Sequence, residues 1–120
     1  MTVRIRRVYE APSRERGDGR RVLVDRLWPR GMTKDRLEID LWMKEIAPSS
    51  DLRRWYGHRP ERFAAFTARY REELRSTERE TDLAGLRRMA RRGRLTLLTA
   101  TRDVDRSAAI VLADLIQRGR

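Results

Sequence analysis

The sequence contains no cysteine and only one histidine, His58, and these absences exclude several kinds of chemistry. Without cysteine there can be no disulfide bond, no thiol nucleophile and no thiolate metal site. A single histidine also excludes a metal site made of histidines alone. We therefore expect neither a bound metal nor a cofactor.

Long hydrophobic runs are also missing. No apolar stretch approaches the ~18 residues that a membrane-spanning helix needs. The first seven residues include three arginines, and no apolar segment of the kind found in a secretion signal follows them. From these features we expect a cytoplasmic chain with no membrane partner.

The length and composition predict a single domain over residues 1–120. A chain of this length buries roughly two-thirds of the surface that it exposes when unfolded, which is enough for one core. The chain is 39% hydrophobic and 39% charged, yet its three Trp and three Tyr and its clear apolar periodicity argue against disorder. The oligomeric state is not specified by any of these features.

Basic residues are in large excess, and the formal net charge is +11. Clustered basic side chains bind polyanions such as nucleic acids, because binding releases condensed counterions. However, only Lys34 and Lys44 are lysines among the 29 basic residues, and the arginines are spread along the whole chain. An arginine-rich composition without a nucleic-acid partner explains the charge equally well.

Three segments have the pattern of β-strands. Residues 3–9 begin with alternating apolar and basic residues, residues 22–24 form a short apolar run, and residues 95–99 form another. Helical segments separate the later strands, so we predict an α/β fold with a small, mainly parallel three-stranded sheet and helices on both faces. The direction of the first strand stays open.

Helix signals occupy most of the remaining chain. Pro48 to Asp51 supply N-cap candidates for a short helix that Gly57 ends, and Pro60 opens a longer one. Thr81 or Asp82 is expected to cap a third helix, which Gly93 ends, and residues 106–117 form the last one. Residues 37–46 fit a strand and a helical turn equally well.

The first candidate site follows the strand at residues 22–24. Ligands of parallel sheets bind beyond the carboxyl ends of the strands, and Asp25, Arg26, Trp28 and Arg30 lie there. Arginine forks suit carboxylates and phosphates, and Trp28 offers a flat surface to a base or a sugar. Asp25 is the one candidate catalytic acid or base, provided that its pKa is shifted toward neutrality. The structural alternative is that Asp25 pairs with a neighbouring arginine and that Trp28 is a core residue.

The second candidate site lies between the strand at residues 95–99 and the last helix. Thr101, Arg102, Arg106 and Ser107 could bind an anion there together with the helix N-terminus. In a parallel sheet this loop opens on the same edge as the first one, so we predict that the two loops face each other. The alternative for this stretch is an ordinary helix cap.

Other charged residues favour structural roles. His58 is expected to be an exposed residue between two helices, although histidine is also the usual acid or base near neutral pH. Asp40 and Lys44 are spaced for a surface ion pair. Four arginines on the third predicted helix are expected to form a solvated face, namely Arg87, Arg88, Arg91 and Arg92.

The run Val22-Leu23-Val24-Asp25-Arg26-Leu27-Trp28-Pro29-Arg30-Gly31 closely resembles the signature of the YeaO-like DUF488 family of small bacterial proteins. Further matches lie along nearly the whole chain, including Ile46-Ala47-Pro48-Ser49 and Thr96-Leu97-Leu98. The resemblance implies a small α/β fold and draws attention to the loop at residues 25–31, but it implies no agreed activity. Family members often carry His-Asn-x-Ala where the last helix begins, whereas this chain has Arg106-Ser107-Ala108-Ala109.

Two functions therefore stay open, with a partner-binding module as a third. The first is binding of a phosphate-bearing or other anionic small molecule, such as a nucleotide, at the carboxyl edge of the sheet, with or without catalysis. Arg26, Arg30, Arg102 and Arg106 would then hold the anion. The second is a nucleic-acid-binding accessory protein that uses a diffuse basic surface. A concave cluster of arginines at one sheet edge favours the first, and a stripe across a broad face favours the second.

Overall fold

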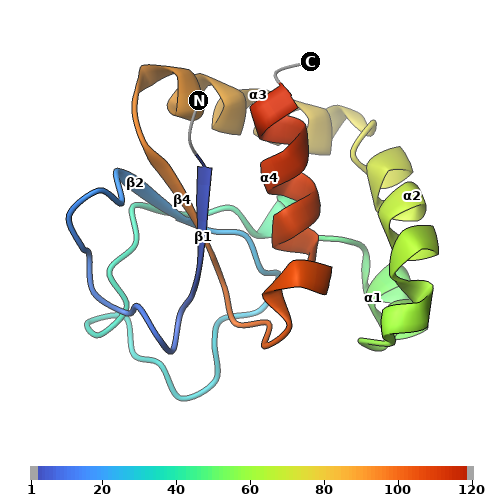
Figure 1. Cartoon of the computed structure of the whole chain (residues 1–120), viewed down its shortest axis with the longest axis horizontal. Helices are drawn as coiled ribbons and strands as arrows, with labels where there is room; N and C mark the ends of the chain where they lie inside the picture. Colours follow the sequence, from blue (N-terminus) through green and yellow to red (C-terminus); the bar gives the residue numbers. More distant parts are fainter. Residues whose placement is uncertain (1–2, 119–120) are drawn as a thin grey trace.

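A computed structural model describes residues 3–118, which form an α/β fold around one parallel sheet (Figure 1). Within these residues the sheet has four strands, in the order β1-β4-β2-β3, rather than the three expected. All pairings are parallel, which settles the direction of the first strand. The strands are β1 (Val3–Arg7), β2 (Arg20–Leu23), β3 (Leu41–Trp42) and β4 (Leu95–Thr99).

The additional strand is β3, and it lies in the segment whose sequence pattern fits both a strand and a helical turn. Residues 37–46 in fact contain both, because β3 is followed directly by a 3₁₀ turn, η1 (Lys44–Ile46). A strand of two residues is too short to give an alternating pattern, so sequence periodicity could not separate it from the turn. By contrast, β4 has the predicted bounds.

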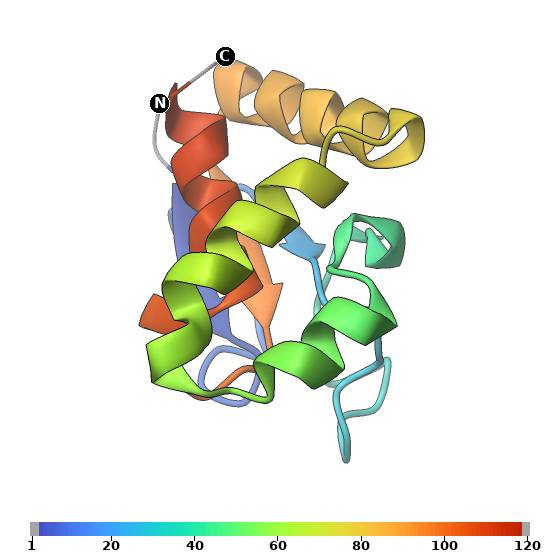
Figure 2. The same ribbon diagram turned by 90° about the vertical axis from the view of Figure 1, so that its right-hand side faces the viewer.

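The helices lie on one face of the sheet only, so the expectation of helices on both faces is wrong (Figure 2). The helices are α1 (Ser50–Tyr56), α2 (Phe63–Glu73), α3 (Thr77–Arg92) and α4 (Ala108–Arg118). The segments that join β1 to β2 and β2 to β3, residues 8–19 and 24–40, contain no helix in the described structure and cover the opposite face. We call them the loop layer.

The alternation of side chains along the strands produces two separate apolar clusters. Val22 and Leu97 belong to the larger cluster, under the helices. Leu23 and Leu98 point the other way and form a smaller cluster with loop residues, including Met32 and Leu37. Because successive side chains in a strand point to opposite faces, both faces of this sheet are apolar at its centre. A polypeptide layer without helices is therefore sufficient to cover the second face.

Local capping signals place most helix ends. Ser49 accepts a hydrogen bond from the Leu52 amide at the start of α1, and Gly57 ends that helix in the left-handed conformation, with φ 53°. Both agree with the prediction. The third helix begins earlier than expected, because Ser76 rather than Thr81 or Asp82 is the N-cap of α3.

The two remaining helices differ slightly from their predicted bounds. Pro60 opens a 3₁₀ turn, η2 (Pro60–Arg62), which continues directly into α2. The last helix is preceded by another such turn, η3 (Val104–Arg106), and packs on β1 and β4 as its wide apolar face predicts. None of the helices in residues 3–118 has the length and apolar character needed to cross a lipid bilayer.

Candidate functional site

The two predicted site loops meet at the edge of the sheet where β2 and β4 end. These strands are hydrogen-bonded neighbours, with Leu23 opposite Leu98. Just beyond them, one oxygen of the Asp25 carboxylate accepts a hydrogen bond from the Thr99 hydroxyl at 2.7 Å. The other oxygen accepts one from the Ala100 amide, also at 2.7 Å. The two loops are therefore adjacent, as predicted, and Asp25 joins them.

The surroundings of Asp25 raise the pKa of its carboxyl group. Burial is the largest influence and disfavours the charged form, while the Ala100 amide, the Thr99 hydroxyl and the more distant Arg53 oppose it. Neither of the two hydrogen-bond donors carries a charge. Asp25 is therefore a half-buried carboxylate that holds two loops together, with both of its oxygens already engaged.

The side chains of Arg26 and Trp28 both make contacts within the protein. The Arg26 guanidinium points toward η1, where it donates to the Ala47 carbonyl at 3.4 Å and lies 3.9 Å from Glu45. The Trp28 ring packs edge-on against Trp42, with 5.4 Å between ring centroids, and its indole nitrogen donates to the Met32 carbonyl. Trp28 is half-buried in the apolar cluster under the loops, which is the structural alternative for this residue.

The other predicted site residues are dispersed along the same edge. The Arg30 side chain is exposed, and its backbone carbonyl accepts a hydrogen bond from the Tyr9 hydroxyl. Arg106 pairs with Asp103 at 3.0 Å. The buried hydroxyl of Ser107 bonds the Val104 carbonyl and the Ile110 amide, and the amide of Thr101 donates to Thr99. The four predicted arginines therefore do not converge on one point.

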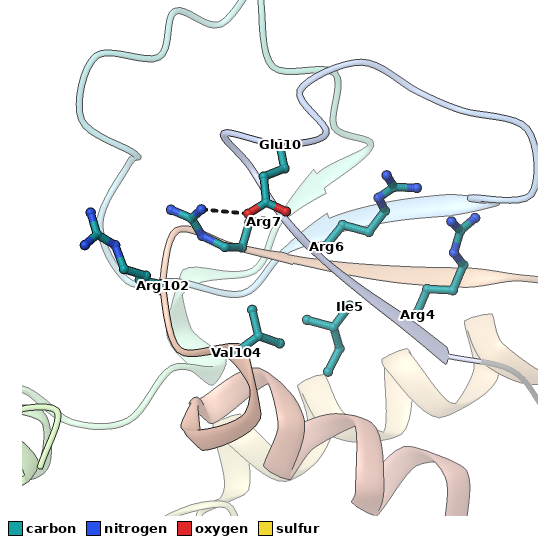
Figure 3. Close-up of a pocket in the computed structure, with 7 residues that line it drawn as sticks. All are labelled: Arg4, Ile5, Arg6, Arg7, Glu10, Arg102 and Val104. Carbon is teal, nitrogen blue, oxygen red and sulfur yellow. Dashed lines mark hydrogen bonds and ion pairs between the residues drawn. The ribbon is translucent and has the colours of Figure 1, made fainter. Parts of the chain in front are cut away.

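Arg102 instead contributes to a hollow that runs along the outer strand β1, which we call the β1 hollow (Figure 3). The β1 hollow has a volume of about 590 Å³. Its lining residues are Arg4, Ile5, Arg6, Arg7, Glu10, Arg102 and Val104. Figure 3 shows Arg102 and the Arg7–Glu10 pair at one end, Arg4 and Arg6 at the other, and Ile5 and Val104 on the side toward α4.

The lining of the β1 hollow is strongly basic. It contains four arginines and a single carboxylate, Glu10, which is already bonded to Arg7 at 2.8 Å. Arg4 and Arg6 pair with carboxylates of the loop layer, whereas Arg102 is exposed and forms no ion pair within residues 3–118. At residues 3–9 the alternation of apolar and basic residues predicted a strand but no ligand site. A charged outer strand was the available signal, since edge strands often carry such residues.

A buried ionic network beneath the loop layer was not predicted from the sequence. Asp18 and Arg21 are fully buried and pair at 2.7 Å. Arg21 also donates to three backbone carbonyls, those of Ala11, Pro12 and Glu38. Three stretches of the loop layer, at residues 11–12, at Asp18 and at Glu38, are thus attached to the Arg21 side chain of β2.

Asp40 belongs to the same network, which corrects the expected surface pair with Lys44. One Asp40 oxygen accepts from the Arg21 amide at 2.8 Å and the other pairs with Arg14 at 2.7 Å. Although burial opposes ionisation, these bonds hold the pKa of Asp40 below its usual value. Lys44 lies over the Trp42 ring instead.

Between residues 3 and 118, no three His, Asp or Glu side chains lie close enough together to hold a metal ion. His58 is exposed in the turn between α1 and η2, as its structural interpretation predicts.

Comparison with known proteins gives the family. The family model described as "Inactive DUF488-N3 subclade" matches residues 2–119. YeaO of Escherichia coli is 39% identical over 117 residues, which cover 98% of each chain. The chain belongs to the YeaO-like DUF488 family. This confirms the resemblance carried by the residues around Asp25.

Other members of the YeaO-like DUF488 family are more similar still. The uncharacterized protein Rv3073c of Mycobacterium tuberculosis is 50% identical over 114 residues, or 95% of this chain and 92% of that protein. The uncharacterized protein Mb3100c of Mycobacterium bovis matches to the same extent. No solved structure matches the chain.

Proposed function

We propose that this YeaO-like chain binds a phosphate-bearing small molecule, such as a nucleotide, in the β1 hollow and does not transform it. The observation that carries the proposal is the lining of that hollow, in which four arginines face a single, already paired carboxylate. Arginine forks donate paired hydrogen bonds to phosphate oxygens. Arg102 is the side chain best placed to do so, because no carboxylate engages it within residues 3–118.

The hollow also supports a ligand with an apolar part. Ile5 and Val104 line it on the side toward α4, next to the charged groups. A nucleotide combines an anionic phosphate with a flat, weakly polar base, and the two parts suit these two kinds of lining. Small-molecule sites commonly combine apolar walls with a few fixed polar groups.

Binding without catalysis is supported by three observations. Both oxygens of Asp25 are occupied by donors of the neighbouring loop, so this candidate acid or base is engaged in holding the structure. The stretch where family members often carry histidine has Arg106 and Ser107 here. The matching subclade is itself described as inactive.

The test is calorimetric titration with nucleoside mono-, di- and triphosphates and with pyrophosphate, on the wild type and on three variants. Arg102→Gln should weaken binding at least about tenfold, the effect of losing a charge-assisted hydrogen bond. Glu10→Gln should strengthen binding, because it removes the one carboxylate and frees Arg7. Arg30→Gln is the matched control, since it removes an exposed arginine from the same sheet edge but not from the hollow.

Two results would overturn the proposal. One is that none of these compounds binds to the wild type. The other is that Arg30→Gln weakens binding while Arg102→Gln does not, which would return the site to the loop after β2. The opposite signs expected for Glu10→Gln and Arg102→Gln also separate local contacts from a general loss of folding, because a misfolded variant cannot bind more tightly.

A further inference from the structure

A second basic hollow lies at the edge of the sheet where β2 and β4 begin. We call it the α3 hollow, and its volume is about 620 Å³. It is formed by the last two turns of α3, by the residues that lead into β2 and β4, and by two residues of the loop layer. The lining residues are Arg14, Gly19, Arg20, Asp40, Gly85, Arg88, Met89, Arg92, Gly93 and Arg94.

Among residues 3–118, carboxylates do not balance the charge of the α3 hollow. Its single carboxylate, Asp40, is engaged by Arg14 and by the Arg21 amide. Four arginines remain, all exposed, and within residues 3–118 none of them forms an ion pair; they are Arg20, Arg88, Arg92 and Arg94. Like charges that share a concave surface repel one another, so this arrangement favours an anionic partner.

Helix stability accounts for only part of this cluster. A basic residue in the last turn of a helix interacts favourably with the helix dipole, and Arg92 of α3 is in that position. Arg88 lies one turn earlier on the same side of the helix, and Arg20 and Arg94 are not on a helix. The convergence of three chain segments on one hollow therefore needs a different explanation.

The basic surface extends beyond the α3 hollow. At Gly17 a Cβ atom would lie 3.0 Å from the Arg94 guanidinium and 3.3 Å from that of Arg4. Arg4 lines the β1 hollow and Arg94 lines the α3 hollow, so the two hollows adjoin at this glycine. Basic side chains of the two hollows therefore lie on either side of Gly17, which suits a polymer with regularly repeated negative charges.

The lining also indicates how such a polymer would be bound. Among the described residues that line the α3 hollow there is no aromatic side chain, and Met89 is the only large apolar one. Proteins that bind single strands usually stack the bases on aromatic rings, whereas contacts with the backbone of a duplex need only charge and hydrogen-bond donors. We propose that the α3 hollow binds the phosphodiester backbone of duplex nucleic acid without reading its sequence.

The experiment measures the affinity of the full chain for a short labelled DNA duplex by fluorescence anisotropy at a series of salt concentrations. Each phosphate neutralised contributes about 0.9 to the log–log slope, so four arginines predict a slope of about −3 to −4. Arg88→Gln combined with Arg92→Gln should reduce that slope by about 2 and weaken binding at least about tenfold at physiological salt.

A second double variant is the matched control. Arg30→Gln combined with Arg59→Gln removes the same charge from two exposed positions that line neither hollow and form no ion pair within residues 3–118. Because these side chains are not in the α3 hollow, the slope should change by less than about 1. Thermal unfolding of each variant checks that the fold is intact.

Three outcomes would overturn the proposal. The wild type fails to bind duplex at physiological salt, the two double variants lose affinity equally, or a single strand of the same length binds more tightly than the duplex. A difference of more than tenfold between duplexes of unrelated sequence would contradict binding without sequence readout. Because none of the substituted residues lines the β1 hollow, these results are independent of nucleotide binding there.

Discussion

Asp18 and Asp25 lie seven positions apart in the sequence, on either side of β2, and their environments shift their pKa values in opposite directions. Asp18 is fully buried, yet its pKa lies below the usual value of 3.8. Asp25 is only half-buried, and its pKa lies above that value. The solvent exposure of the two side chains alone would predict the reverse order.

The difference follows from the partners of the two carboxylates. In both cases burial raises the pKa, but Asp18 accepts a hydrogen bond from the Glu15 amide and pairs with the Arg21 guanidinium, and Arg4 lies 3.2 Å away. Asp25 has only two neutral donors, Thr99 and Ala100. At Asp18 the Glu15 amide and the positive charges of Arg21 and Arg4 together outweigh desolvation, whereas at Asp25 desolvation is the dominant influence.

The largest effect on this contrast between Asp18 and Asp25 is expected from removing Arg21, the cation that pairs with Asp18. Arg21→Met should destabilise the fold by about 3–5 kcal/mol, because it leaves the buried Asp18 carboxylate without its closest charged partner. Three backbone carbonyls of the loop layer lose a donor at the same time. The measurement is the free energy of unfolding from urea denaturation.

The adjacent residue provides the control for this variant. Arg20 receives the same substitution, but it is exposed and forms no ion pair within residues 3–118. Arg20→Met should therefore change the free energy of unfolding by less than about 0.5 kcal/mol. Equal destabilisation by the two variants would show that the buried network does not attach the loop layer to the sheet.

Substitution of Asp25 should destabilise the fold less than substitution of Arg21. Asp25→Ala removes two hydrogen bonds between the loops after β2 and β4 and should destabilise the fold by about 1–3 kcal/mol. Asp105→Ala, on the exposed turn η3, is the control and should have little effect. A melting temperature that stays the same in Asp25→Ala would mean that these bonds contribute nothing to stability.

The sequence was sufficient to predict the elements whose signals are local. The apolar run at residues 95–99 gave β4 with its observed bounds, and Ser49 and Gly57 marked the ends of α1. The contact between the two site loops was also predictable, because parallel neighbouring strands bring their carboxyl ends together. The position of Asp25 next to the loop after β4 follows directly from that rule.

Long-range contacts could not be predicted in the same way. The pairing of Asp18 with Arg21 depends on the path of the chain between β1 and β2, where Pro12, Gly17 and Gly19 predict a loop but not its course. The directions of the four site arginines depend on which carbonyls and carboxylates lie within reach, such as Ala47 for Arg26. The α3 hollow combines segments from three parts of the chain, and none of them has a distinctive motif.

The smallest expected effect is also the most direct test of the comparison. The contributions of Asp18 and Asp25 to stability should depend on pH in opposite directions. Because the pKa of Asp18 is lowered on folding, its contribution is present above pH 3.8 and is lost as the pH falls through the folded pKa. Because the pKa of Asp25 is raised, its contribution is present below pH 3.8 and is lost as the pH rises through the folded pKa. The measurement is urea denaturation between about pH 3 and pH 7 of the wild type, Asp18→Asn and Asp25→Asn.

Both variants keep the shape of the side chain but cannot ionise, so the difference from the wild type reports each carboxyl group separately. The stability advantage of the wild type over Asp18→Asn should shrink as the pH falls below about 4, since the protonated carboxyl no longer pairs with Arg21. Any advantage over Asp25→Asn should shrink as the pH rises above about 4, because an amide can bond Ala100 and Thr99 without the penalty of a buried charge. If the two differences change in the same direction with pH, the partners of these carboxylates do not control their ionisation as the structure indicates.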